Sequence, residues 1–312
     1  MNLRQFEIFC AIAEHRHFKR AGASIGVTQS AVTQALKTLE ADFETKLIDR
    51  SQRPLELTVA GETLLKGARA MLASMDRLKH DVAGATENRQ SRISVGAIVS
   101  AGISYLPSAI AEFSASFPGV DVRTAFGTSE RVAEMILGGE VDLGLVSFPQ
   151  STGPMRVVPW IEEPMRVICS VNHPWAQYRE VDVRQLGEVP MIGFNRALRL
   201  RQRIDEVLVE AGVEADVTME FDNADSMIRA IQATDGVGIL PEMAVRRETA
   251  AGTLKVVATR GFRMTRPLGV AFKRDQRPGA ATIEFIRTLT GRSIDAHPKP
   301  DHAPANRVSV VA

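Results

Sequence analysis

Hydrophobic residues recur at intervals of three and four in the first forty residues, which predicts three short helices. The first helix is indicated by Leu3, Phe6, Ile8, Phe9 and Ile12. A second is predicted over residues 18–25 and a third over residues 28–40. Gly26 permits a tight turn between them, and Thr28 is expected to cap the third helix by accepting a backbone N–H. Two short helices joined in this way predict a helix-turn-helix.

The polar side of the third helix carries short hydrogen-bonding groups where a solvated face usually carries Glu and Lys. These residues are Thr28, Gln29, Ser30, Thr33, Gln34 and Lys37. In a helix-turn-helix this helix enters the DNA major groove, where Gln reads adenine and hydroxyls contact bases or phosphates. Taken alone, the same residues fit a polar solvent face. DNA binding is favoured by the next segment, a predicted hairpin with Lys46, Arg50 and Arg53 that fits a wing.

A long helix is predicted from Thr58, as its cap, to about Asn88, a length of roughly 45 Å at 1.5 Å per residue. One apolar stripe runs along it, formed by Leu64, Ala68, Met71, Met75, Leu78 and Val82. These steps of four and three are a heptad seam, which favours pairing with a second copy and hence a homodimer. The alternative is a helix that packs on its own domain.

Strand and helix patterns alternate after the polar break at residues 85–91. Strands are predicted over 92–98, 121–127 and 141–148, with helices over 104–117 and 129–139 between them. A second cycle begins with a strand over 165–171. Such alternation predicts parallel sheets flanked by helices, in two α/β lobes. The predicted domains are 1–58 (DNA binding), 59–89 (linker and dimerisation), 90–292 (lobe one about 90–162 and 267–292, lobe two about 163–266) and a tail over 293–312.

Candidate ligand-binding residues follow the strands, because ligands of parallel sheets lie at the carboxyl ends of strands. They are Ser100, Thr128, Ser129, Ser147, Asn195, Arg196 and Asn223. Helix amino termini that converge there suit an anion, although Ser129 and Asn223 are equally explained as plain N-caps. Arg196, Arg199 and Arg201 offer guanidinium groups for a carboxylate or phosphate, and a solvated basic helix face explains them as well.

Composition narrows the range of functions. The 312 residues are 45% hydrophobic and 24% charged, and 38 basic against 37 acidic residues exclude a general affinity for nucleic acid, so DNA binding must rest on a local surface. Cys10 and Cys169 lie in separate apolar runs and are expected to be buried thiols. His297 and His302, in the Pro-rich tail, fit a solvated segment better than a metal site. With no signal sequence and no apolar run near ~18 residues, a cytoplasmic protein without membrane contact is expected.

The segment from Met1 to Leu65, with "TQSAVTQALKTLE", "KLIDR" and "LTVAGETLL", resembles the LysR-type transcriptional regulators. The resemblance continues more weakly to about residue 290. It implies that the polar residues of the third helix face DNA, that Arg50 and Arg53 lie on the wing, and that the dimers often pair as a dimer of dimers. It also implies a regulatory half like a periplasmic binding protein, with an effector between its lobes. The family's usual Gly-Ser-Gly-Thr type turn is replaced here by "GFNRALRLR".

Other classes of protein fit less well. An enzyme would need a nucleophile, a base or a metal set, and the sequence offers no such cluster. A transport-type solute-binding protein would require export and leaves the first ninety residues without a role. An architectural DNA binder without a ligand is a further alternative, which a ligand-induced change in thermal stability or DNA footprint would separate from a sensor. The sequence therefore predicts an α/β transcriptional regulator with a winged helix-turn-helix, no cofactor and a small, anionic co-inducer. Its output is expected through promoter bending or contact with RNA polymerase.

Overall fold

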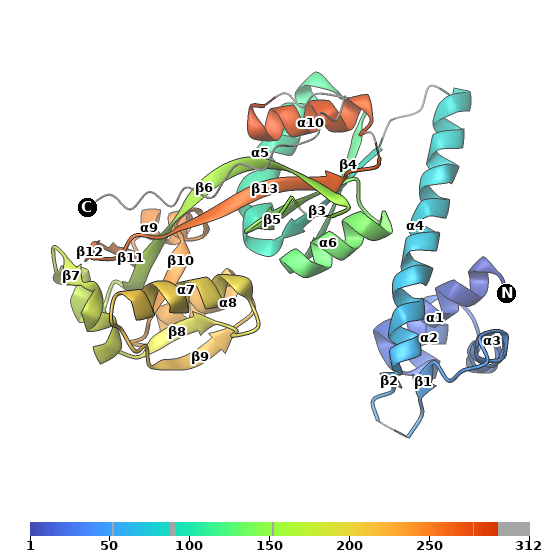
Figure 1. Ribbon diagram of the computed structural model, residues 1–312, viewed down its shortest axis with the longest axis horizontal. Coiled ribbons are helices and arrows are strands. Elements are labelled where there is room, and N and C mark those ends of the chain that lie inside the picture. Colours follow the sequence, from blue (N-terminus) through green and yellow to red (C-terminus); the bar gives the residue numbers. More distant parts are fainter. Residues whose placement is uncertain (52, 88–91, 152, 277, 293–312) are drawn as a thin grey trace.

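The computed structural model describes residues 1–51, 53–87, 92–151, 153–276 and 278–292. Figure 1 shows a small helical domain, one long helix that leaves it, and a two-lobed α/β region. The predicted tail, with His297 and His302, lies outside the described residues.

The small domain forms because the apolar faces of three helices meet in one core. The helices are α1 (Leu3–His15), α2 (Phe18–Ser24) and α3 (Gln29–Asp42). Phe9, Leu36 and Leu39 are completely buried, as the helical spacing predicted. Gly26 has a φ of 71°, which glycine adopts without strain, and Thr28 caps α3 by accepting from Ala31 N at 3.2 Å. The predicted helix-turn-helix is confirmed.

The wing and the long helix share one junction. The antiparallel hairpin of β1 (Ile48–Asp49) and β2 (Glu56–Leu57) is followed at once by α4 (Val59–Glu87). Thr58 fastens the start of α4, because its Oγ1 accepts from Gly61 N at 3.0 Å and donates to Lys46 O at 2.7 Å. The predicted cap and helix are thus present.

The apolar stripe predicted along α4 divides into two parts. Leu64 and Ala68 pack into the core of the helical domain. Met71 and Leu78, further along the helix, are 51% and 55% exposed. Packing on its own domain therefore accounts for the first part of the stripe only. The side chain of Val82 lies outside the described residues.

Lobe one is a sheet covered by helices on both faces (Figure 1). Its strands β4, β3 and β5 are parallel, as the alternating pattern predicted. They lie in the order β4-β3-β5. Phe113 and Phe285 meet edge to face on one side of the sheet, with ring centroids 5.2 Å apart. Val132 and Ile136 pack on the other side. The elements are β3 (Arg92–Ile98), α5 (Val99–Ser116), β4 (Asp121–Gly127), α6 (Ser129–Gly138), β5 (Leu143–Ser147) and α10 (Ala280–Thr290).

Lobe two is a second sheet of similar design, in which β10, β8 and β9 are parallel and β11 lies beside β6. Met227, Ile231 and Ile239 are at the centre of its core. The elements are β7 (Val181–Asp182), β8 (Met191–Phe194), α7 (Arg199–Glu210), β9 (Val217–Phe221), α8 (Ala224–Ala233), β10 (Val237–Pro241), α9 (Arg246–Ala250), β11 (Leu254–Val257) and β12 (Thr259–Arg260).

Two long antiparallel strands, β6 (Met155–Ser170) and β13 (Thr265–Lys273), run between the lobes (Figure 1). β6 pairs with β13 as far as Pro164 and with β10 from Met165 onward, so one strand belongs to both sheets. The sequence predicted only the second half of β6. Prolines and two adjacent acids interrupt the alternation of its first half, which is a strand because β13 pairs with it.

Helix α5 also differs from its prediction, because it begins at Val99 and not at Ser104. Gly102 weakens the helical pattern there, and the structure shows why a glycine is present. A Cβ at this position would lie 2.3 Å from Cε1 of Phe126. The earlier start brings Ser100 into the first turn of the helix.

Two glycines of α4 give a matched test of how this helix packs. A Cβ at Gly61 would lie 2.0 Å from the backbone oxygen of Leu47, whereas a Cβ at Gly67 meets nothing within 4 Å. We expect Gly61→Ala to lower the free energy of unfolding by about 1–3 kcal/mol through overpacking. Gly67→Ala should raise it by up to ~1 kcal/mol through helix propensity. Urea unfolding of both variants checks this, and equal stability would contradict the close contact of α4 with the backbone of Leu47, just before β1.

Candidate DNA-binding surface and effector pocket

The polar residues of α3 lie on its solvent face, because the apolar face is committed to the core. Gln29, Ser30, Gln34 and Lys37 are exposed. Thr28 is partly occupied by its cap and by a 2.8 Å contact with Ser30 Oγ. Thr33 donates to Gln29 O at 2.9 Å, as a helical threonine often does. Of the six predicted residues, five are thus exposed and Thr33 is partly buried.

The two wing arginines differ in their surroundings. Arg53 is exposed at the tip of the hairpin. Arg50 turns back toward the helices, where its Nη2 lies 3.0 Å from Glu40 Oε2 and its guanidinium lies 5.8 Å from the centre of the Phe18 ring. Arg50 thus fixes the wing to the domain, whereas the side chain of Arg53 is exposed to solvent.

Glu40 is a structural residue that the sequence analysis missed. It is only 6% exposed although it carries a carboxylate. Its oxygens accept from Leu47 N at 3.1 Å, Arg50 Nη2 at 3.0 Å and Lys46 Nζ at 3.3 Å. The end of α3 is in this way bound to the wing. A signal was present, since an acid stands where the apolar spacing of α3 calls for a buried residue.

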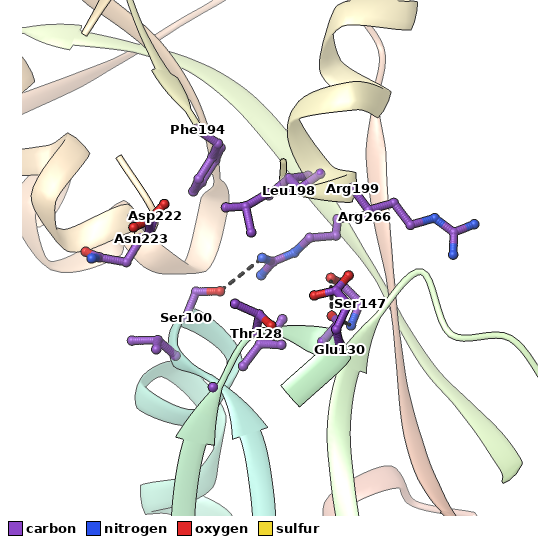
Figure 2. Close-up of a pocket in the computed structure, with 16 residues that line it drawn as sticks. Ser100, Thr128, Glu130, Ser147, Phe194, Leu198, Arg199, Asp222, Asn223 and Arg266 are labelled. Atoms are coloured by element: carbon purple, nitrogen blue, oxygen red, sulfur yellow. Dashed lines mark hydrogen bonds between the residues drawn. The ribbon is translucent and has the colours of Figure 1, made fainter. Parts of the chain in front are cut away.

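A cavity of about 270 Å³ lies between the two lobes. Lobe one contributes Ser100, Thr128, Ser129 and Ser147, and lobe two contributes Asn223. Five of the seven predicted residues are therefore brought together by the ends of strands and the starts of helices. Figure 2 shows Ser100, Thr128 and Ser147 on one side of the space between the lobes and Asn223 on the other.

Several of the five also have local structural roles. Thr128, not Ser129, is the N-cap of α6, where its Oγ1 accepts from Arg131 N at 3.3 Å. Ser129 Oγ lies 3.2 Å from Ser147 Oγ, which joins α6 to β5. Asn223 caps α8 by accepting from Ser226 N at 2.9 Å. Asn223 is therefore an N-cap, as this alternative predicted. The N-cap of α6 is Thr128 and not Ser129.

Asn195 and Arg196 are not among the residues that line the cavity. Asn195 Oδ1 accepts from Ala197 N at 3.0 Å in a local turn, and Arg196 Nε donates to Glu220 at 2.9 Å. The neighbouring Arg201 is buried, and it donates to Asp205 at 2.7 Å and to Glu220 at 3.0 Å. Partners nearby, which a linear sequence does not reveal, hold these two arginines away from the cavity.

Two arginines do line the cavity, and the sequence analysis singled out only one of them. Arg199 lies at the exposed edge, with its guanidinium 5.7 Å from the centre of the Phe148 ring. Arg266, at the start of β13, lies at the floor and donates to Ser100 Oγ at 3.0 Å (Figure 2). It also pairs with Glu163 on β6. Arg266 was missed because its partners stand far from it in sequence and only the pairing of β6 with β13 brings them close.

The first turns of two helices complete the cavity. Neither α5 nor α7 has a side-chain cap. Val99, the first residue of α5, and Leu198, the N-cap residue of α7, both line the cavity. Uncapped N–H groups and the helix dipole favour an anion. The cavity therefore combines two guanidinium groups and two helix amino termini with apolar walls.

The described part of the chain contains no group of three or more His, Cys, Asp and Glu residues placed to hold a metal ion. Across the same residues, none of the helices has the length and apolar character needed to cross a bilayer.

A winged helix-turn-helix joined by a long helix to two lobes with a cavity between them defines a DNA-binding regulator that responds to a ligand. Residues 3–62 match the bacterial regulatory helix-turn-helix of the lysR family, and residues 86–293 match the LysR substrate binding domain. The chain therefore belongs to the LysR family of transcriptional regulators. It is a DNA-binding regulator under the control of a small effector, and its homologues are regulators, not enzymes.

Relatives of known name support this assignment along most of the chain. A probable hydrogen peroxide-inducible genes activator of Mycobacterium avium is 30% identical over 286 residues, covering 91% of this chain and 90% of that protein. The transcriptional activator CmpR of Synechocystis is 24% identical over 287 residues, or 92% of this chain and 94% of its own.

Solved structures show the same fold. Full-length CbnR complexed with its target DNA has a TM-score of 0.70 at 22% identity, covering 93% of this chain and 99% of that one. The regulatory domain of Synechocystis CcmR in complex with 2-PG has a TM-score of 0.59 at 22% identity, covering 65% of this chain and 97% of that one.

The anchoring of the wing generates a prediction about stability. Glu40→Ala removes the acceptor of three hydrogen bonds and leaves a buried N–H unpaired, so we expect it to lower the free energy of unfolding by about 1–3 kcal/mol. Operator affinity should fall with it, because the wing is no longer held to α3. Glu56→Ala, at an exposed position of the same hairpin, is the control. Chemical unfolding and gel shifts measure both, and a fully stable Glu40→Ala would refute the role of the carboxylate.

Proposed function

We propose that this regulator reads promoter DNA with α3 and its wing, and that a small anionic metabolite between the lobes changes its output. The observation that carries the proposal is the cavity itself. Side chains from both lobes line it, next to the place where the paired strands β6 and β13 run from one lobe to the other. A ligand held by both lobes binds the closed arrangement better than the open one and so shifts the equilibrium between them.

On the DNA side, Gln29, Ser30 and Gln34 are the candidates for base contacts, and Lys37 and Arg53 for phosphate contacts. All five are exposed on one domain. Thr28, Thr33 and Arg50 remain in the proposed surface, with the additional task of fixing α3 and the wing. A chain of net charge near +1 binds DNA through such a local surface, and two copies strengthen it.

The exposed second part of the α4 stripe, with Met71 and Leu78, supports a homodimer through this helix. A dimer of dimers is proposed on the family resemblance. Binding to promoters places the protein in the cytoplasm, where promoter bending or contact with RNA polymerase would carry the signal.

On the effector side, the proposed contacts are Ser100, Thr128, Ser129, Ser147 and Asn223, joined by Arg199 and Arg266. Asn195 and Arg196 are not among the proposed effector contacts, because Asn195 Oδ1 accepts from Ala197 N and Arg196 Nε donates to Glu220. No organic cofactor or metal enters the proposal.

Several relatives are hydrogen peroxide-inducible genes activators, so peroxide is the rival signal. Two observations speak against thiol sensing in this chain. Cys10 and Cys169 are free cysteines on different domains. Burial raises the pKa of the Cys169 thiol to about 11 and also raises the pKa of Cys10, so little reactive thiolate forms near neutral pH.

DNA reading by α3 and the wing is tested by separating base contacts from phosphate contacts. Gln29→Ala and Gln34→Ala should each cost about 1–3 kcal/mol at the preferred site and relax its base preference. Arg53→Ala should weaken all sites alike and reduce the salt slope by about 1. Lys255→Ala, an exposed change in lobe two, is the control of equal charge. Gel shifts across salt concentrations on selected and scrambled DNA decide, and unaltered preference in both Gln variants would exclude base reading by α3.

Effector control is tested with operator DNA selected from random sequence and a panel of small carboxylates, phosphates and amino acids. The true effector should change the footprint and, at a hundred times its Kd, stabilise the protein by about 2.7 kcal/mol. Hydrogen peroxide should leave the footprint unchanged, also in a Cys10→Ala, Cys169→Ala double variant. Leu198→Trp, which fills the cavity, should remove the response, whereas Val209→Trp, exposed near the end of α7 away from the cavity, should keep it. A response that survives Leu198→Trp would place the effector elsewhere.

A further inference from the structure

We infer that Arg266 and Glu163 together set the charge of the effector: a single carboxylate on an apolar body, in preference to a dianion such as a phosphomonoester. This inference rests on the proposed function of the cavity and specifies its ligand.

Arg266 and Glu163 form a buried ion pair on the two strands that run between the lobes. They face each other in register on β13 and β6 and are 2% and 1% exposed. Arg266 Nε lies 2.9 Å from Glu163 Oε2, and Tyr105 of α5 donates to Glu163 Oε1 at 3.0 Å. Burial and the Glu163 carboxylate raise the pKa of Tyr105, so its hydroxyl keeps the proton that it donates. Both oxygens of Glu163 are thus occupied, and the carboxylate stays beside the guanidinium.

The guanidinium of Arg266 still has donors for a ligand. Of its five N–H groups, those on Nε and one on Nη2 are directed to Glu163, and one on Nη1 to Ser100 Oγ. Among the interactions of the described residues, this leaves one N–H on each terminal nitrogen. In Figure 2 the group projects into the space between the lobes. Two donors and the Ser100 hydroxyl match the acceptors of one carboxylate.

The charges around the cavity disfavour a second negative charge. The carboxylates of the exposed Glu130 and Asp222 line the same cavity as Arg199 and Arg266, while Glu163 neutralises Arg266 from behind. Carboxylates therefore outnumber guanidinium groups by one. The amino termini of α5 and α7 add roughly half a positive charge each, so the balance is close to neutral. A monoanion is accepted at the floor, but the extra charge of a dianion meets Glu130 and Asp222.

The rest of the wall indicates an apolar body. Ile98, Phe194, Leu198, Leu200 and Ala224 surround the floor, in a cavity of about 270 Å³. That volume is near the lower end for small-molecule sites, which favours a small ligand.

Three probes of one shape test the inference: cyclohexanecarboxylate, its neutral amide, and cyclohexyl phosphate, which is mostly a dianion at pH 7.5. Titrations of the full-length protein by ligand-observed NMR measure the affinities. We expect the carboxylate to bind at least tenfold tighter than either of the other two. Equal or tighter binding of the phosphate, or no binding of the carboxylate, would overturn the inference.

Variants separate the pair from general packing. Glu163→Gln frees the full charge of Arg266 and should reduce the preference for carboxylate over phosphate at least tenfold. A double variant, Arg266→Gln with Glu163→Gln, should bind the carboxylate and the amide alike. Because buried changes can unfold a protein, Asp222→Asn provides an exposed route to the same answer and should strengthen phosphate binding severalfold. Asp216→Asn, at the opposite end of β9, is its control.

The two proposals fail in different ways. If the phosphate is preferred, or if Asp222→Asn and Asp216→Asn bind it equally, the charge selection is wrong although the cavity remains a ligand site. If the carboxylate binds as expected but neither it nor any metabolite alters the operator footprint, the selection stands and effector control of DNA binding fails.

Discussion

The pairing of β6 with β13 is the constraint on which the ligand site depends. Each strand passes from one sheet toward the other, and β6 changes its partner from β13 to β10 between Pro164 and Met165. Every movement of one lobe against the other must bend these strands at that point. Arg266 and Glu163 stand beside it, and Arg266 also lines the cavity, so a ligand at the floor would lie next to this point.

Helix α6 connects the cavity with the linker helix over a short path. Its first turn, with Thr128 and Ser129, lines the cavity, and its other half lies against α4. Lys66 Nζ of α4 is 3.0 Å from Glu134 Oε1, and Gly138 is so close that a Cβ there would lie 3.5 Å from the Cβ of Ala70. A ligand that displaces α6 would therefore act on α4 directly through these packed side chains.

What the sequence predicted correctly depends on local patterns. The spacing of α3, the cap at Thr28 and the strand that ends near Ser147 are decided by neighbours within one element, and all lie as expected. The errors concern partners distant in sequence. β6 is a strand because of β13, Arg266 reaches Ser100 across 166 residues, and Arg196 is held by Glu220. The spacing of charges along a chain does not reveal which carboxylate will meet which arginine.

The division of the α4 stripe determines which parts of a dimer can move. Leu64 and Ala68 are committed to the helical domain, and Thr58 fixes the start of α4 to the wing. The domain and the first turns of α4 therefore behave as one rigid body, because a packed core deforms little. In the proposed homodimer, pairing would begin beyond them, at the exposed Met71 and Leu78. A small rotation of one α4 helix about its partner would then be transmitted to α3, and the separation of the two α3 helices would select the spacing of the DNA half-sites.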